Sequence, residues 1–504
     1  MLNSKDITKI QEIEPIFKKE RSFSDTLVDL LELFNLKSLC LKNGMKKLKG
    51  YPVREILSIL ILFPFMSFST VRAFFYSKFN QLTEAKKDTF FRLKNNEDYN
   101  WRNLLYLFAK RFKTLARRSD NESSESPKCF ILDDTTIKKE GIKIEFIGKV
   151  FDHVIRRFVL GFKKLVLGFW DGKNLIPLDF SYHSEKGKNK KRPFGLLIRQ
   201  LKQRFSKRRS KTSAGYKRTK ELNLDKITNG VAMIKRALKH GFVPDYVLTD
   251  SWFSSAYFIK MIRRLKNGII HFLGMVRLDK RLYDYQGQRL NAKELKTQLK
   301  SRMKRARNFN VYYIEIIVGY DEIGNVKLFF TRFSKRSKWR LLLSTDLKLS
   351  FQQAMKIYNI RWSIEVMFKE CKQLLNLGKC QSNDFDAQIA DATISLILYI
   401  MLSFHKRIHC YNSLGELFAR CRDDFIEATV AQKLWRLFLT IQWTIAEVFE
   451  IDFVKMMRVI FQSFEIMKTV TVLSKIFFEG DFDVEPEKSF PSGQFGIRKL
   501  LLVN

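Results

Sequence analysis

Apolar residues follow two different spacings along the chain, and the spacing changes near residue 128. Before residue 120 they recur every three or four positions, as in FSDTLVDLLELFNL and VREILSILILFPFMSFSTVRAFF, which is typical of helices with one buried face. Pro64 interrupts the second segment, and Ser69 or Thr70 can cap a helix that begins at TVRAFF. We therefore expect residues 1–120 to form a helical region that includes a helix, a turn and a second helix.

After residue 128 the apolar runs become short and are bounded by turn residues. KCFILDDTT predicts a strand that ends in two carboxylates, and RRFVLGFKKLVLGFW and LIPLDFSYH predict a β-hairpin, because Asp171 and Gly172 supply its turn. A helix over about residues 220–240, the strand DYVLT, a helix over 254–266 and the strand IIHFLGMV follow. Strands that alternate with helices predict an α/β core.

The helical spacing lapses between residues 280 and 345. VYYIEIIVGY, NVKLFFTRF and WRLLLST have the β-branched and aromatic content of strands, with DEIGN as a turn, so this segment predicts a mostly β insertion. Helical spacing returns over residues 346–376 and continues through 377–504, except in the tail 479–493, which we expect to be loosely ordered. The first part of the core then covers residues 128–279.

The charge balance narrows the class of partner. The 504 residues contain 92 Lys and Arg against 52 Asp and Glu, a net charge of +40. Because so many like charges repel one another in a folded chain, the excess favours a polyanionic partner, nucleic acid first and an anionic membrane surface second.

A membrane location is not favoured. The apolar run 56–68 is broken by Pro64, and the run 392–404 is shorter than the roughly 20 residues that a span needs, so both predict core helices. The N-terminus lacks the pattern of a signal peptide. The six cysteines are scattered without C-x-x-C spacing, so the sequence suggests neither a zinc cluster nor a disulfide framework, and a reducing cytoplasm fits.

One helical segment, IYNIRWSIEVMFKECK, carries an unusual set of polar residues. Steps of three, four and seven residues place Tyr358, Arg361, Glu365 and Lys372 within roughly 60° of one another around a helix. A solvated ion pair between Arg361 and Glu365 would explain two of them. It would not explain why the phenol and the second base share their face.

Two predicted strands lead into carboxylates, ILDD at Asp133 and VLTD at Asp250, and Glu365 lies on the polar helix face. An Asp after a strand is often a turn residue or a helix cap. Three carboxylates from separate elements would repel one another unless cations lay between them. Hard divalent ions such as Mg²⁺ take oxygen ligands of this kind, and a pair of them roughly 4 Å apart supports phosphoryl transfer.

These residues resemble those of a known family. D-x-T-x-I at Asp133, VLTDSWFSS around Asp250, and Y-x-x-R-x-x-x-E-x-x-x-x-x-x-K from Tyr358 to Lys372 are similar to the DDE transposases of bacterial insertion sequences. The similarity is to the insertion sequence 4-like branch, which has a Tyr-Arg-Glu-Lys signature and a β insertion before the last acid. It covers about residues 128–376 and implies a ribonuclease H-like catalytic core with two Mg²⁺ ions, for which Mn²⁺ can substitute.

The resemblance also implies roles for single residues. Asp133, Asp250 and Glu365 would be the catalytic metal ligands, with Asp134 as an alternative to Asp133, because both positions satisfy D-x-T. Tyr358, Arg361 and Lys372 would hold phosphates of the element's end, and Arg and Lys suit that task chemically.

Other features favour contact with DNA. The densely basic segment 186–220 is either a solvated loop or a site of phosphate contact. Trp339 in the insertion is either a core residue or a platform on which a flipped base stacks. Trp362 and Trp252 are expected to be packing residues of the catalytic domain. In the helix–turn–helix reading Arg72 and Lys78 would lie against a duplex, and an ordinary helical hairpin remains the alternative.

The predicted function is cut-and-paste transposition of the encoding element by cleavage of a phosphodiester and strand transfer. The expected partners are double-stranded DNA, namely the terminal inverted repeats and the target, and a second copy of the chain that joins through the C-terminal region, in the cytoplasm at the bacterial nucleoid. Two alternatives stay open: a metal-dependent nuclease without strand transfer, and a domesticated, non-catalytic DNA-binding relative.

Overall fold

The computed structural model describes residues 26–48, 50–119, 126–334, 336–409 and 411–426, together with Ile445, Phe449, Ile451, Asp452 and Met456. The predicted tail at 479–493 lies outside the described residues. The chain forms two compact units, which we describe separately. The first comprises Met1–Leu36, Gly50–Lys87 and Gly415–Asn504, and the second comprises Lys37–Lys49 and Asp88–Leu414.

The described part of the first unit is helical, with α2 (Thr26–Leu33), β2 (Tyr51–Pro52), α4 (Val53–Leu62), α5 (Val71–Phe75) and η1 (Lys78–Leu82). α4 ends two residues before Pro64, and the Thr70 side chain caps α5 by accepting from the Ala73 N–H at 3.1 Å, as predicted. α5 is only five residues long and Lys78 lies beyond it, in η1. Arg72 and Lys78 therefore do not share one helix, as the helix–turn–helix reading assumed.

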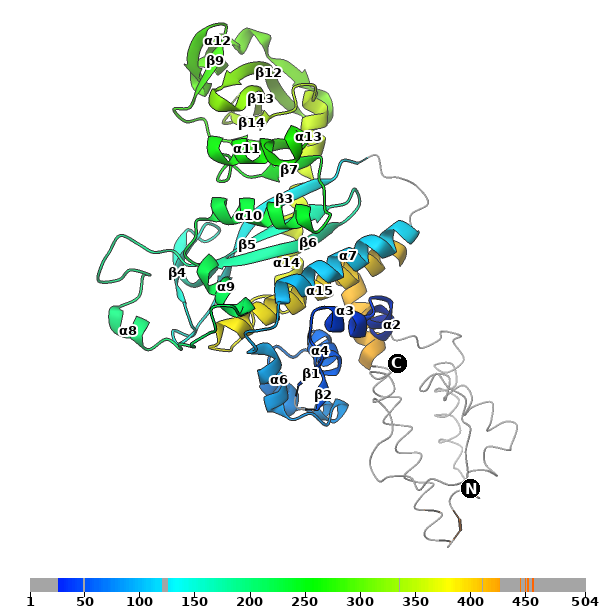
Figure 1. Cartoon of the computed structure of the whole chain (residues 1–504). Coiled ribbons are helices and arrows are strands. Elements are labelled where there is room, and N and C mark those ends of the chain that lie inside the picture. Colours follow the sequence, from blue (N-terminus) through cyan, green and yellow to red (C-terminus); the bar gives the residue numbers. More distant parts are fainter. Residues whose placement is uncertain are drawn as a thin grey trace. The chain divides into compact units, whose positions relative to one another are not determined.

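The second unit is built on a mixed sheet with helices on both faces (Figure 1). The sheet's main path runs β10 (Gln288–Asn291), β9 (Leu282–Tyr285), β12 (Val311–Tyr320), β13 (Gly324–Arg332), β14 (Arg340–Ser344), β8 (His271–Val276), β7 (Tyr246–Thr249), β3 (Cys129–Lys138), β5 (Arg157–Trp170) and β4 (Gly148–Asp152). β6 (Leu175–His183) also pairs with β5, and β11 (Lys304–Ala306) pairs with β12. The mixed α/β class is confirmed.

The strand directions divide this sheet into two parts. β5 is antiparallel to its neighbours β3 and β6, whereas β7 is parallel to both β3 and β8. From β14 outwards every described pairing is antiparallel, and β14 pairs with β8, so the predicted β insertion continues the core sheet and does not form a sheet of its own. Asp171 and Gly172 form the turn between β5 and β6, as predicted, with Gly172 at a φ of 109°.

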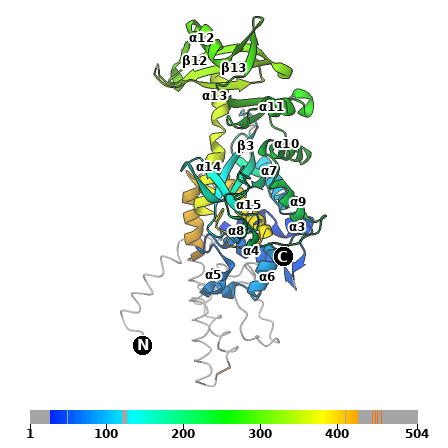
Figure 2. The same cartoon turned by 90° about the vertical axis from the view of Figure 1, so that its left-hand side faces the viewer.

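Helices cover both faces of the core strands. Figures 1 and 2 show α10 (Lys226–Lys239) on one face of β3 and α14 (Trp362–Leu374) on the other. Gly230 lets α10 approach closely, because a Cβ at this position would lie 2.6 Å from Leu132 Cδ2. Further α-helices are α3 (Leu36–Lys42), α6 (Lys87–Lys94), α7 (Trp101–Ser119), α8 (Ile198–Lys202), α9 (Ala214–Glu221), α11 (Ala256–Arg263), α12 (Ala292–Gln298), α13 (Phe351–Asn359) and α15 (Phe385–His409).

Two predicted helices are divided. The helix expected over 220–240 is α9 followed by α10, because the Asp225 side chain accepts from the Thr228 N–H at 2.8 Å and starts a new helix. The helix expected through residues 357–372 breaks between α13 and α14, where the Arg361 and Ile364 N–H groups donate to carbonyls three residues back, at 3.0 and 3.3 Å. Bonds of this 3₁₀ type tighten the backbone, so the side chains of α14 are rotated about the helix axis relative to their places on a continuous α-helix.

α15 is long and apolar enough to cross a membrane, with 25 residues, although the apolar run 392–404 alone is shorter. Within the protein, 94% of its most apolar window is buried, which agrees with the prediction of a core helix. It is the one helix of this kind among the described residues.

Candidate active site

Of the two strands that lead to the acidic residues, β3 extends further along the sheet than β7. β3 does not end at Asp133 and Asp134, as the sequence suggested, but continues to Lys138 in pairing with β5. Its other neighbour, β7, pairs with β3 only as far as Leu132 and Thr249. The edge of β3 is therefore uncovered from Asp133 onwards, on the side where the chain leaves β7 through Asp250.

A cavity of about 800 Å³ opens at this place. It brings together most of the predicted site residues, which come from β3, the end of β7 and the start of α14. The cavity is lined by Asp133, Asp134, Thr135, Thr136, Ile137, Lys138, Asp152, His153, Val154, Lys163, Asp250, Arg361, Glu365, Phe368, Lys369, Lys372, Leu377, Gly378 and Lys379. We refer to it as the acidic pocket.

The aspartates of the pocket raise one another's pKa values: Asp250 acts on Asp133, and Asp134 acts on Asp250. Burial raises the pKa of Asp133 to about 7, and the negative charge of Asp250 contributes to this rise. Burial also raises the pKa of Asp250, although the Trp252 N–H, which donates to its carboxylate at 2.9 Å, acts in the opposite direction. Asp250 thus has the turn role that an Asp after a strand often has, and it also lines the pocket.

Arg361 joins two of the acids. Its guanidinium donates to Asp133 Oδ2 at 3.0 Å and to Glu365 Oε1 at 2.6 Å. Since Arg361 lies at the break between α13 and α14 and Glu365 lies in the first turn of α14, the local backbone sets how this side chain reaches β3. The predicted ion pair of Arg361 and Glu365 therefore exists, but it is anchored to the sheet and is not an isolated surface pair.

Tyr358 and Lys372 lie on either side of this contact. The Arg361 guanidinium carbon is 5.7 Å from the centre of the Tyr358 ring, and burial raises the pKa of Tyr358 to about 12. Tyr358 does not line the pocket, whereas Lys372 does, and its Nζ donates to Thr135 Oγ1 at 2.6 Å. Trp339 lies in the insertion, half-buried, with the Arg332 guanidinium 4.5 Å from its ring centre, and does not line the pocket.

The two candidate aspartates of β3 have different partners. Asp134 forms ion pairs with Lys226 of α10, at 2.5 Å, and with Lys163 of β5, at 3.7 Å. Asp133 has Arg361 as its cationic partner. Sequence reasoning missed Lys163 and Lys226; a signal for the first was a pair of lysines in the middle of an apolar strand.

Two tryptophans were predicted to be packing residues of the catalytic domain; Trp252 does pack against Phe253, with ring centres 4.8 Å apart, but both side chains are exposed. Trp362 is 61% exposed and Trp252 is 39% exposed. Trp252 lies under the Lys226 ammonium, 4.3 Å from its ring centre, and Trp362 directly follows Arg361. Both aromatic rings therefore stand close in sequence to residues that line the acidic pocket.

The acidic pocket suits divalent cations in its donor chemistry. Its acids supply hard carboxylate oxygens, and burial, together with the charge of Asp250, raises the pKa of Asp133 although Arg361 acts in the opposite direction. Among the described residues, however, no group of three or more His, Cys, Asp or Glu side chains stands ready to hold a metal ion. Arg361 occupies one oxygen of Asp133 and one of Glu365, so a cation that binds either of these oxygens would displace it.

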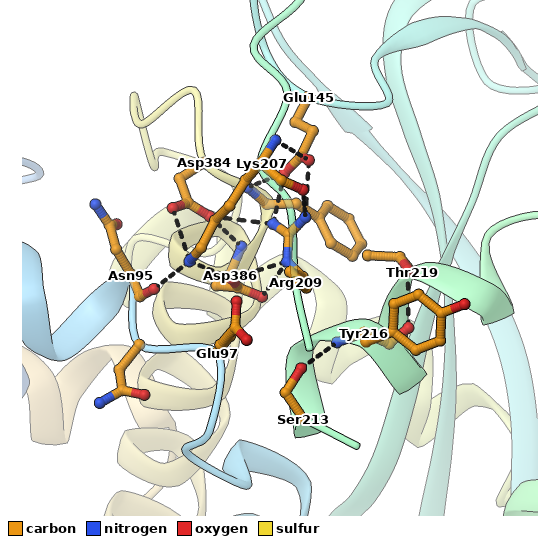
Figure 3. A network of polar contacts seen from close by, with 12 residues as sticks. Asn95, Glu97, Glu145, Lys207, Arg209, Ser213, Tyr216, Thr219, Asp384 and Asp386 are labelled. Carbon is orange, nitrogen blue, oxygen red and sulfur yellow. Dashed lines mark hydrogen bonds and ion pairs between the residues drawn. The ribbon is translucent and has the colours of Figure 1, made fainter. Parts of the chain in front are cut away.

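The basic segment 186–220 is partly fixed in place, as Figure 3 shows. Arg209 donates to Glu145 Oε2 at 2.6 Å and to Asp386 Oδ2 at 3.0 Å, and Lys207 Nζ donates to Asp386 Oδ2 at 2.7 Å. Asp384 also pairs with both bases. We call these five residues the anchoring network. Lys207 and Arg209 therefore serve in holding the segment, whereas Lys188, Lys190 and Lys191 are exposed.

Residues 124–401 match a protein family described as "Transposase DDE domain". The chain belongs to this family. It is thus a DDE-type transposase, an enzyme of DNA transposition and recombination whose substrate is DNA and whose family generally uses divalent metal ions.

Other comparisons add little to the family assignment of this transposase. No curated protein matches the chain. Among solved structures, it is similar to the NurA nuclease from Sulfolobus solfataricus at 12% identity and a TM-score of 0.21, over 51% of this chain and 82% of that one. A TM-score this low supports no further conclusion.

Proposed function

We propose that this transposase moves its own insertion sequence by cut-and-paste, as a member of the insertion sequence 4-like branch with the Tyr-Arg-Glu-Lys signature. The observation that carries the proposal is the acidic pocket, in which Asp133, Asp250 and Glu365 meet although more than a hundred residues separate each from the next. Arg361 and Lys372 of the same signature line the same pocket.

A ribonuclease H-like core is part of the proposal. The strand order β8-β7-β3-β5-β6, in which β5 is antiparallel to β3 and β6 while β7 and β8 are parallel to β3, supports it. So do the helices α10 and α14 on opposite faces, because α14 can then bring Glu365 to the end of β7. The site lies beyond the carboxyl end of a parallel strand, as sites in α/β sheets commonly do.

Asp133, Asp250 and Glu365 would hold two Mg²⁺ ions, for which Mn²⁺ can substitute. When bound, the ions would activate the attacking hydroxyl and stabilise the leaving oxygen. We favour Asp133 over Asp134 as the ligand, because Asp134 already has two lysine partners and Asp133 feels the charge of Asp250.

The bases of the pocket would position the DNA strand. Arg361 offers a planar guanidinium and Lys372 an ammonium that now donates to Thr135, and both groups can donate to phosphate oxygens instead. Tyr358 packs close to Arg361 and would orient it. Trp339, which is half-buried beside Arg332, and Trp362, which is exposed, would each offer a ring on which an unpaired base could stack.

The reaction has two steps of the same type. Water attacks the phosphodiester at the element's end, the bond from phosphorus to the 3′ oxygen breaks, and a 3′ hydroxyl is released. That hydroxyl then attacks a target phosphodiester, forms a new ester bond and displaces the 3′ oxygen of the target. Neither step needs a covalent bond to the protein.

The other parts of the chain complete the proposal. Residues 1–120 would bind the terminal inverted repeats, residues 128–279 and 346–376 would form the core around the insertion at 280–345, and residues 377–504 would pair two copies of the chain. Because two ends must meet one target, a homodimer on the DNA is the expected assembly, acting at the nucleoid in the bacterial cytoplasm.

The test is cleavage and strand transfer with purified protein and DNA that carries the element's ends. We expect Glu365→Ala to lose Mg²⁺-dependent cleavage while binding to end DNA is retained, because the change removes a cation ligand and none of the bases. Gln373→Ala, at an exposed position of the same helix, is the matched control and should cleave normally. Full cleavage by Glu365→Ala would refute the assignment.

A precleaved end with a free 3′ hydroxyl separates transposition from simple nuclease activity. The wild-type protein should join this end to a target. Cleavage without joining would favour the nuclease alternative, and the absence of both, with DNA binding intact, would favour a non-catalytic relative.

A further inference from the structure

A hairpin beside the acidic pocket exposes an unusual amount of apolar surface. The four-residue turn between β4 and β5, together with the first residues of β5, contains Val154 at 90%, Ile155 at 37% and Phe158 at 64% exposure. Single exposed apolar residues are common, but three within five positions on one turn are a feature that needs a partner. We call residues 153–158 the hairpin tip.

The hairpin tip is held in a defined shape. The Asp152 carboxylate accepts from the Val154 N–H at 3.0 Å and pairs with Lys138 at 3.2 Å. Arg156 adopts a left-handed φ of 52°, which closes the turn, and Phe158 packs edge-on against Phe151 with ring centres 5.3 Å apart. These contacts hold the backbone, so Val154 points outwards from a firm base.

The hairpin tip also lies at the reaction site. His153 and Val154 line the acidic pocket together with the three candidate metal ligands. A DNA strand whose phosphodiester enters the pocket would therefore pass within contact distance of Val154.

The positive charge around the hairpin tip favours DNA over a second protein chain as the partner of its apolar residues. Arg156 and Arg157 are both exposed, as are Lys138 and Lys149 nearby on β3 and β4, and the tip itself contains no acidic residue. An apolar residue flanked by arginines is the combination by which proteins separate stacked base steps while they hold the adjoining phosphates. The same combination fits a second protein chain less well, because basic residues would face the basic surface of another copy.

We propose that the hairpin tip is a wedge that inserts Val154 against the bases next to the scissile phosphate, while Arg156 and Arg157 hold the flanking phosphates. The proposal rests on the proposed function and deepens it, since it names how the DNA end is opened for the acidic pocket. Opening paired bases costs a few kcal/mol, and less where the bases are already unpaired.

The test uses Val154→Ser and end DNA with 2-aminopurine, a base that fluoresces more strongly when unstacked, next to the scissile bond. We expect wild-type protein to raise the fluorescence on binding and Val154→Ser to raise it much less, with similar affinity, since both arginines remain. Cleavage of fully paired ends by Val154→Ser should fall roughly tenfold, about 1.4 kcal/mol in the barrier.

Rescue distinguishes a wedge from a merely structural residue. Ends with two unpaired bases at the cleavage position should be cleaved by Val154→Ser nearly as fast as by wild type. Ile269→Ser is the matched control, because Ile269 is 70% exposed just before β8, at the other end of the parallel strands. It should behave as wild type in every assay.

Three results would overturn the proposal. The first is equal 2-aminopurine fluorescence with wild type and Val154→Ser, and the second is that ends with unpaired bases do not restore cleavage by Val154→Ser. The third is that Val154→Ser changes the oligomeric state of the protein but not the unstacking of the DNA. The last would make the tip an interface between copies of the chain. If wild type fails to cleave at all, the proposed function fails, yet the fluorescence comparison still decides whether the tip unstacks DNA.

Discussion

The second unit contains two clusters of carboxylates, and they differ in how their charges are met. In the anchoring network Glu145, Asp384 and Asp386 face Arg209 and Lys207, and the Arg209 side chain is 2% exposed. Backbone N–H groups add further donors, from Lys207 and Phe385 to Glu145 and from Asp386 to Asp384. In the acidic pocket Asp133, Asp250 and Glu365 have Arg361 as the cation that bonds two of them.

The difference separates a structural cluster from a reactive one. In the anchoring network, burial lowers the pKa of Arg209, but the carboxylates that accept its hydrogen bonds raise this pKa by more. In the acidic pocket, burial and a neighbouring acid raise the pKa of Asp133 to about 7. A buried carboxylate whose pKa is raised in this way costs stability, and such a cost is typical of functional sites.

The largest effect on folding should come from the anchoring network. Arg209→Met leaves three buried carboxylates with one base, so we expect the free energy of unfolding to fall by about 3–5 kcal/mol. Thermal or urea unfolding of the purified chain measures this. Arg208→Met, at the exposed neighbouring position, is the control and should unfold like wild type; an equal loss in both variants would mean that the network does not anchor the fold.

An intermediate effect is expected for the acid of β3 that has lysine partners. Asp134→Asn weakens the pairs with Lys226 and with Lys163, whose side chain is 3% exposed, and should cost about 1.5–3 kcal/mol of unfolding free energy. Mg²⁺-dependent cleavage should survive under conditions in which the variant is folded. Loss of cleavage in the folded variant would instead make Asp134 the metal ligand.

The smallest change in stability is expected for Asp133→Asn, at the neighbouring acid of β3. Asp133→Asn keeps an oxygen that can accept from Arg361 and removes the repulsion of Asp250, so unfolding in metal-free buffer should change by less than about 1 kcal/mol. The same variant should lose the increase in melting temperature that Mg²⁺ gives the wild type, because a ligand stabilises only a fold that binds it. A large loss of stability without metal would place Asp133 with the structural acids.

Much of the fold follows from local patterns in the sequence. The β5–β6 hairpin, the strands β7, β8, β12, β13 and β14, and the cap of α5 by Thr70 form where spacing and turn residues predict them. The errors lie where a side chain or a neighbouring strand decides the boundary. Asp225 starts a new helix inside a run of helical spacing, and β3 continues past its two aspartates because β5 pairs with it to Lys138.

The sequence predicted several residues that line the acidic pocket, but it did not predict the contacts between them. The signature positions identified Asp133, Asp250, Arg361, Glu365 and Lys372, which the structure brings into one cavity. The sequence could not show that Arg361 bridges two acids, because this depends on the break between α13 and α14. It also misplaced Trp362, since an aromatic residue in an apolar helix pattern predicts burial and only the packing of α14 on β3 shows its exposure.

The central claim is that the acidic pocket, and not another carboxylate cluster, binds the divalent cations. Titration of metal-free protein with Mn²⁺, followed by the electron paramagnetic resonance signal of the free ion, tests it most directly without relying on activity. The account predicts that wild type and Asp134→Asn remove Mn²⁺ from solution alike and that Asp250→Asn loses this binding. Equal Mn²⁺ binding by wild type and Asp250→Asn would contradict it.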